Sequence, residues 1–109
     1  MCCDIIILMN KFKVLFINEV RDFINSLPDD DRGKINCETI AMGLGNFDSL
    51  YIKTLNTPIK ELIIKKYRLI FFINRNEIWF IGAFIKKTAK TPKNEIENAK
   101  KLYKEIINL

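Results

Sequence analysis

The chain contains no histidine among its 109 residues. Histidine is the commonest general base and metal ligand, and it completes the Ser-His-Asp and Cys-His arrangements of many hydrolases. Its absence therefore excludes much of known enzyme chemistry. Glycine is also scarce, and none of the four glycines stands at the spacing of a phosphate-binding loop: Gly33, Gly43, Gly45 and Gly82. We therefore do not expect nucleotide-dependent catalysis.

Cysteine is equally rare, and the three cysteines form no Cys-x-x-Cys pair: Cys2, Cys3 and Cys37. They support neither a disulfide framework nor a zinc site, so we expect a reducing, cytoplasmic environment. The apolar run from Ile5 to Met9 is far shorter than the roughly 20 residues that span a bilayer, and it lacks the flanks of a signal peptide. Neither secretion nor membrane insertion is expected.

The length predicts a single domain over residues 1–109, because a chain of this size holds one hydrophobic core. Residues 1–8 have two interpretations. Met9-Asn10-Lys11 resembles a natural chain start, which makes residues 1–8 an N-terminal extension. Alternatively, residues 1–8 lengthen the first strand.

Charge is distributed unevenly along the chain. Residues 1–58 carry six Lys and Arg against eight Asp and Glu, whereas residues 59–109 carry twelve against five. A basic half of this kind favours a polyanionic partner such as RNA, because clustered cations release counterions from phosphates. The alternative is a lysine-rich surface that only keeps the protein in solution.

The N-terminal half predicts one strand and two helices. Lys11 to Ile17 alternates like a half-buried strand, and Asn18 then caps a helix that ends at Pro28. The apolar stripe of this helix is Val20, Phe23, Ile24 and Leu27. A second helix opens with the acids Asp29 to Asp31, which we interpret as a solvated cap rather than a metal site. Its buried stripe is expected at Cys37, Ile40, Ala41 and Leu44, with Gly43 and Gly45 ending it.

The C-terminal half predicts strands followed by a helix. The β-like runs are Tyr51–Leu55, Lys60–Ile64, Tyr67–Ile73 and Ile78–Ile85. The turn at Asn74-Arg75-Asn76 makes the last two a hairpin, whereas Lys65-Lys66 is a poor two-residue turn because neither residue readily takes a positive φ. Thr91 is expected to cap the last helix, with Pro92 at its first position. The apolar side of that helix is Ile96, Ala99, Tyr103 and Ile106, so the chain reads as α+β.

The residues that can carry chemistry are cations near the ends of the predicted strands: Lys65, Lys66, Arg68, Lys86, Lys87 and Lys90. Such a cluster can hold a phosphodiester and stabilise a phosphorane, while the adjacent ribose 2′-hydroxyl attacks without a metal or a protein nucleophile. The alternative is that these cations only solvate the rim of a sheet. Tyr67, within the same stretch, is either a core residue or a platform for a stacked base.

The segment Lys60 to Ile107 resembles the RelE/ParE toxin superfamily, and within it the phage-derived, HigB-like branch. The most specific string is Lys86-Lys87-Thr88 followed by Lys90-Thr91-Pro92. Other matching positions are Glu61-Leu62, Tyr67-Arg68, Phe84, Glu95-Ile96 and Ala99.

This resemblance implies a compact RelE-like fold, a β-α-α-β-β-β sheet with an N-terminal helical hairpin and a C-terminal helix. It implies a growth-arresting toxin that cuts messenger RNA on the ribosome, and an antitoxin partner with a helix-turn-helix. Neither a metal nor a cofactor is expected. The implied catalytic residues are Arg68, Lys87 and Lys90. The implied RNA-binding residues are Lys65, Lys66, Tyr67, Lys86 and Lys93.

Two positions depart from the family pattern. Ile63 stands where an arginine is expected after Glu61-Leu62, and Gly82 stands where a histidine often precedes the last aromatic position of the strand. These departures keep two other functions open. One is a non-catalytic inhibitor of DNA gyrase like the ParE members. The other is a degenerate toxin that retains only antitoxin binding.

Overall fold

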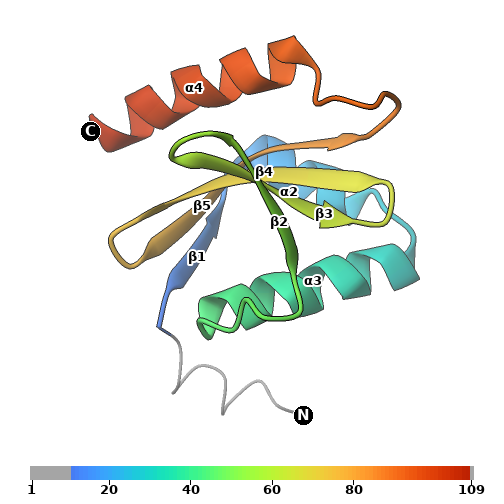
Figure 1. Ribbon diagram of the computed structural model, residues 1–109. Coiled ribbons are helices and arrows are strands. Elements are labelled where there is room, and N and C mark those ends of the chain that lie inside the picture. Colours follow the sequence, from blue (N-terminus) through green and yellow to red (C-terminus); the bar gives the residue numbers. More distant parts are fainter. Residues whose placement is uncertain (1–10, 109) are drawn as a thin grey trace.

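The computed structural model describes residues 11–108, which form a five-stranded sheet with helices on both faces (Figure 1). The elements in chain order are β1 (Lys13–Phe16), α2 (Asn18–Asn25), α3 (Asp29–Gly43), β2 (Tyr51–Asn56), β3 (Ile59–Ile64), β4 (Tyr67–Asn74), β5 (Glu77–Ile85) and α4 (Lys93–Ile107). The strand order is β1-β5-β4-β3-β2. The β1–β5 pair is parallel and the other pairs are antiparallel. The expected α+β class is confirmed, and the segment from Tyr51 supplies a fifth strand.

Two apolar cores lie on opposite faces of the sheet. Helices α2 and α3 cover one face, and α4 lies across the other (Figure 1). The first core contains Ile24 and Ile35 from the helices, together with Leu69 and Phe80 from the sheet. The second core joins Ala99 of α4 to buried strand residues, which are Ile59, Ile70, Phe72 and Ile81. This arrangement uses both sides of the central strands β4 and β5, whose sequences are accordingly apolar almost throughout.

Helix α2 buries the stripe expected from its sequence, with Val20 and Ile24 each 1% exposed. The expected cap is wrong in detail. The capping position is Ile17 rather than Asn18, and no side chain caps the helix. Asn18 is instead the first helical residue, because Ile17 is held in extended backbone by its N–H bond to the carbonyl of Phe80.

Helix α3 buries a different stripe from the one expected. Ile35, Thr39 and Met42 face the core, whereas Cys37 and Ile40 are exposed. These three buried positions follow the i, i+4, i+7 spacing of one helical face. Thr39 can be buried because its hydroxyl donates to the carbonyl of Asn36 at 3.1 Å, which satisfies its polar group within the helix.

The end of α3 is as expected. The helix ends at Gly43, and Gly45 takes a φ of +82°, a left-handed conformation that glycine adopts without strain.

The hairpin turns place two cationic residues in left-handed backbone. The turn between β4 and β5 is confirmed, with Arg75 at a φ of 57°. The turn between β3 and β4 is also a two-residue turn, with Lys65 at a φ of 54°. The expectation that Lys65-Lys66 is a poor two-residue turn is therefore wrong, because Lys65 does take a positive φ.

The start of α4 corrects another expectation. Pro92 occupies the capping position, the helix begins at Lys93, and no side chain caps it. The hydroxyl of Thr91 donates instead to Glu61 on β3.

The two interpretations of residues 1–8 concern a segment outside the described residues. Within residues 11–108, no helix is both long enough and apolar enough to cross a membrane.

Candidate functional site

The predicted cations meet at one end of the sheet, where the β3–β4 turn adjoins the end of β5. The backbone N–H of Lys86 donates to the carbonyl of Lys66 at 2.8 Å. In the same region Arg68 pairs with Phe84 across β4 and β5. The fold thus brings the backbone of Lys86 beside the stretch that carries Lys66 and Arg68, although the two come from separate parts of the sequence, and it creates a cationic edge suited to an anionic ligand.

Arg68 is held at this edge by the backbone. Its Nη1 donates to the carbonyl oxygens of Lys65 and Tyr67, both at 2.9 Å. Its Nε is buried and has no hydrogen-bond partner among the described residues. These contacts fix one of the three guanidinium nitrogens and give the side chain a defined position beside the turn.

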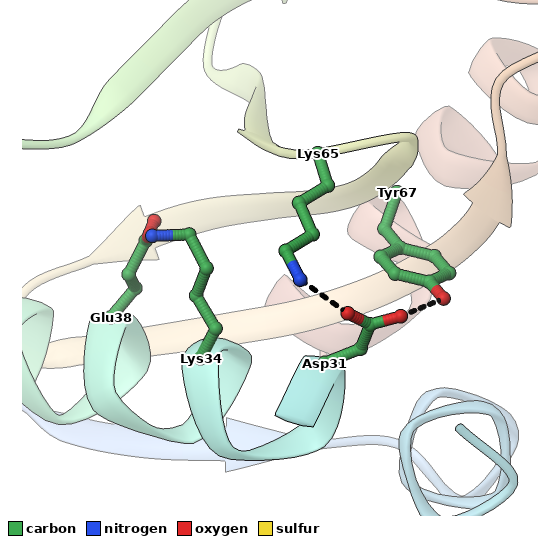
Figure 2. A network of polar contacts seen from close by, with 5 residues as sticks. All are labelled: Asp31, Lys34, Glu38, Lys65 and Tyr67. Atoms are coloured by element: carbon green, nitrogen blue, oxygen red, sulfur yellow. Dashed lines mark hydrogen bonds and ion pairs between the residues drawn. The ribbon is translucent and has the colours of Figure 1, made fainter. Parts of the chain in front are cut away.

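Asp31 at the start of α3 connects the helix to the β3–β4 turn (Figure 2). The Lys65 ammonium lies 2.6 Å from one carboxylate oxygen, and the Tyr67 hydroxyl donates to the other at 2.5 Å. The hydrogen bond from Lys65 lowers the pKa of the Asp31 carboxyl most, and the hydrogen bond from Tyr67 lowers it further. Asp31 in turn raises the pKa of both Lys65 and Tyr67. This contact holds the Lys65 side chain against α3. Sequence analysis predicted only a helix-dipole role for Asp31, so this contact was missed.

This network changes the roles of two predicted RNA-binding residues. The charge of Lys65 is compensated by Asp31, so it is less available to a phosphate than that of Lys66. The ring of Tyr67 is 2% exposed and packs edge-on against Phe23, with ring centroids 6.1 Å apart. Tyr67 is therefore a core residue that offers no open face to a base, and the stacking role is not supported by this arrangement.

The remaining predicted cations lie on the segment between β5 and α4 and at the start of α4. Lys87 and Lys90 are exposed, and Lys93 is the first residue of α4. Lys87 lines an open, largely apolar cleft between α2, the end of β5 and the start of α4, together with Phe23, Phe84, Ile85, Pro92 and Glu95. Burial raises the pKa of the Glu95 carboxyl in this cleft. Lys87 and Lys90 thus follow Lys86 of the cationic edge closely in sequence, but they lie on a segment without regular secondary structure.

A buried hydrogen bond connects this segment to the sheet. The hydroxyl of Thr91 donates to Oε2 of Glu61 at 2.7 Å, with Thr91 9% exposed and Glu61 fully buried. Both residues belong to the motifs recognised in the sequence. Their contact spans 30 positions, so no local sequence pattern predicted it.

The two positions that depart from the family pattern lie on β3 and β5, the strands on either side of Arg68. Ile63 is the direct partner of Arg68 on β3. Gly82 pairs with Ile70, and a Cβ atom at Gly82 would lie 3.4 Å from two side-chain atoms of Ile70. The edge around Arg68 therefore has an aliphatic neighbour where the family pattern has a second cation.

Acidic and sulfur ligands do not gather in the part of the chain that the structure describes. Across residues 11–108, no three His, Cys, Asp or Glu side chains lie close enough together to hold a metal ion. The consecutive acids Asp29 to Asp31 therefore form no such cluster, and Asp31 pairs instead with Lys65.

Comparisons with known proteins agree with this architecture. Residues 22–104 match the family model described as phage-derived protein Gp49-like. A chain of the archaeal RelE–RelB complex from Pyrococcus horikoshii is similar over 72% of this chain and 99% of its own, with 13% identity and a TM-score of 0.61. A chain of the RelB–RelE antitoxin–toxin complex from Methanococcus jannaschii is similar over 65% and 88%, with 18% identity and a TM-score of 0.56. No curated protein matches the sequence.

Proposed function

Because the chain belongs to the Gp49-like family of phage-derived proteins and has a RelE-like fold, we propose that it is the toxin of a toxin–antitoxin pair. Its proposed activity is metal-independent cleavage of messenger RNA on the ribosome, which stops translation. The HigB-like branch, inferred from the Lys86 to Pro92 string, stays a prediction.

The observation that carries the nuclease proposal is the position of Arg68 at the cationic edge. Its guanidinium is fixed through two carbonyl oxygens beside the Lys65-Lys66 turn, and its backbone pairs with Phe84 near the end of β5. A fixed cation of this kind stabilises charge that develops during a reaction without having to reorganise. Lys66 and Lys86, whose backbones are hydrogen-bonded, supply further positive charge for the phosphates on either side.

The proposed reaction uses the substrate's own nucleophile. The ribose 2′-oxygen bonds to the adjacent phosphorus, the bond from phosphorus to the 5′-oxygen breaks, and a 2′,3′-cyclic phosphate remains. Arg68 stabilises the phosphorane, and Lys86 and Lys87 hold the backbone. Lys90 or Lys66 takes the 2′-hydroxyl proton and returns it to the leaving oxygen, which is the role that histidine fills in many ribonucleases.

The proposed partner is an antitoxin that covers the basic surface. Two solved structures that resemble the chain in fold are complexes of RelE with RelB. The resemblance adds a helix-turn-helix to the expected antitoxin. The proposed antitoxin contacts this surface with an acidic segment, because negative charge complements the surplus of cations in residues 59–109.

The proposal is tested by brief expression of the chain in bacterial cells, beside Arg68→Ala. New messenger RNA 5′ ends are mapped while protein synthesis is followed. We expect wild type alone to produce ends within translated codons and to stop synthesis. Synthesis that continues, or that stops without new ends, contradicts the nuclease proposal.

A second candidate is favoured by the aliphatic neighbour of Arg68. Ile63 removes one cation from the edge, so the remaining site resembles a binding surface more than a fully equipped nuclease. A non-catalytic inhibitor of DNA gyrase would arrest growth with a DNA-damage response and no new RNA ends. A degenerate toxin that retains only antitoxin binding would not arrest growth.

A further inference from the structure

Glu61 is a fully buried carboxyl group on β3, which lies between β4 and the edge strand β2. A buried acid needs hydrogen-bond partners, because water no longer solvates it. Thr91 satisfies Oε2, whereas Oε1 is buried without a partner among the described residues. A second buried polar atom without a partner is Nε of Arg68, on the neighbouring strand.

The strand register places these two residues on the same face of the sheet. Glu61 pairs with Ile70, and Arg68 pairs with Ile63. Side chains alternate between faces, so Glu61, Arg68 and Ile70 all project toward the side that α4 covers. Glu61 and Arg68 are diagonal neighbours, a separation that long side chains can bridge. Glu61 and Arg68 thus lie on the same face of the sheet, and each has one buried polar atom without a hydrogen-bond partner among the described residues.

We infer that Glu61 is a positioning residue that aligns the two cationic parts of the site. Through Thr91 it holds the segment that carries Lys87 and Lys90 against the sheet. Through its negative charge it orients the guanidinium of Arg68 toward the bound phosphate. This inference rests on the proposed function, since it assigns both roles to the RNA site.

A simpler reading is that the Glu61–Thr91 bond only fastens α4 to the sheet. Two nearly isosteric substitutions separate the readings. Thr91→Val removes the hydroxyl donor and retains the charge of Glu61. Glu61→Gln removes the charge and retains an oxygen that Thr91 can donate to. Thr39→Val is the matched control, because Thr39 is another buried threonine, with a hydroxyl bonded to the Asn36 carbonyl away from the site.

The mobility of the segment is measured by limited trypsin digestion, which cleaves after lysine. We expect Thr91→Val to speed cleavage after Lys87 and Lys90 by about tenfold, the factor for one lost hydrogen bond to a charged acceptor. Thr91→Ser restores the donor and should restore the wild-type rate. Thr39→Val should leave cleavage close to wild type, and Glu61→Gln, which retains an acceptor without its charge, should speed cleavage less than Thr91→Val. Equal rates for Thr91→Val and Thr39→Val would overturn the anchoring role.

The effect on the site is measured as affinity for a short single-stranded RNA oligonucleotide. We expect Glu61→Gln to weaken binding by about tenfold, and to have no effect in an Arg68→Ala background, since the two residues then act as a coupled pair. If Glu61 had no positioning role, loss of its negative charge would favour the phosphates. Tighter binding by Glu61→Gln, or an equal loss in both backgrounds, would therefore overturn the inference.

These measurements separate the inference from the proposed function. A wild-type chain that binds the oligonucleotide but makes no new RNA ends in cells contradicts the nuclease proposal alone, and the double-substitution result still decides the role of Glu61. A wild-type chain that neither binds the oligonucleotide nor makes new RNA ends in cells contradicts both.

Discussion

The backbone N–H of Lys86 donates to the carbonyl oxygen of Lys66, and this 2.8 Å bond joins the end of β5 to the β3–β4 turn. The bond extends the pairing of β4 with β5 beyond the last strand residues, Tyr67 and Ile85. Two lysines that are twenty positions apart in sequence therefore flank the same edge. Lys87 and Lys90 follow Lys86 closely along the chain and are exposed, so they extend the positive charge of this edge.

Substitution of both Lys87 and Lys90 by Gln should weaken RNA binding and make it less sensitive to salt. Each lost phosphate contact lowers the slope of log affinity against log salt by about 0.7 for single strands. We therefore expect a slope smaller by about 1.4. The control is Lys101→Gln with Lys104→Gln, two exposed lysines of α4. The slope is measured by titration at several salt concentrations, and an equal change in the control would show only an effect of net charge.

Arg68→Ala should abolish RNA cleavage while the fold persists. A lost transition-state contact to a developing negative charge lowers the rate by about 10² to 10³. Arg75→Asn is the matched control, because Arg75 is an exposed arginine at the opposite end of β4, and Asn tolerates its positive φ. Cleavage is followed on ribosomes carrying messenger RNA, and circular dichroism verifies the fold. A folded Arg68→Ala variant with full activity would remove Arg68 from the site.

Asp31→Asn should lower the thermal unfolding midpoint in a pH-dependent manner. Because Lys65 and Tyr67 lower the pKa of Asp31, its stabilising effect is complete above the ordinary Asp pKa of about 3.9, and is lost as pH falls through the lower folded-state pKa. The raised pKa values of Lys65 and Tyr67 set the upper limit, since their contributions are lost as pH rises through those values.

The difference in midpoint between wild type and Asp31→Asn should therefore be largest between about pH 5 and pH 9, and it should shrink toward acid. Asp30→Asn removes the same charge from the exposed neighbouring position and serves as the control. A difference that stays constant from pH 2 to pH 9 would show that the carboxylate charge is not what connects α3 to the turn.

Ile35→Ala should destabilise the protein much more than Cys37→Ala. Ile35 is fully buried in the core beneath the sheet, so its truncation should cost about 2–5 kcal/mol. Cys37 is exposed on the opposite side of α3, where substitutions usually change stability by less than about 0.5 kcal/mol. Denaturant unfolding measures both, and similar losses would indicate that α3 is rotated about its axis.

Local patterns predicted the elements of the fold well. The stripe of α2 was correct because its apolar residues keep helical spacing and no polar residue interrupts them. The stripe of α3 was wrong because Thr39 lies within it, and a threonine that bonds to its own helix can be buried like an aliphatic residue. Helical spacing alone could not distinguish this stripe from the one through Cys37 and Ile40.

Long-range partners limited the prediction of the site. The cations Arg68 and Lys86 were identified from composition and resemblance, and the strand order brings their backbones to one edge. The roles of Asp31 and Thr91 were missed, because each is set by a partner about 30 positions away. Side-chain bonds of this length depend on tertiary packing, so the neighbouring residues contain no signal for them.

The pairing of β1 with β5 also determines when the protein can fold during its synthesis. Lys13 pairs with Glu77 and Phe16 with Phe80, so the strand made first needs the strand made last. The hairpins of β3, β4 and β5 close through short turns and can form early, whereas closing the long loop between β1 and β5 is slow. A nascent chain therefore lacks its complete sheet until β5 has left the ribosome.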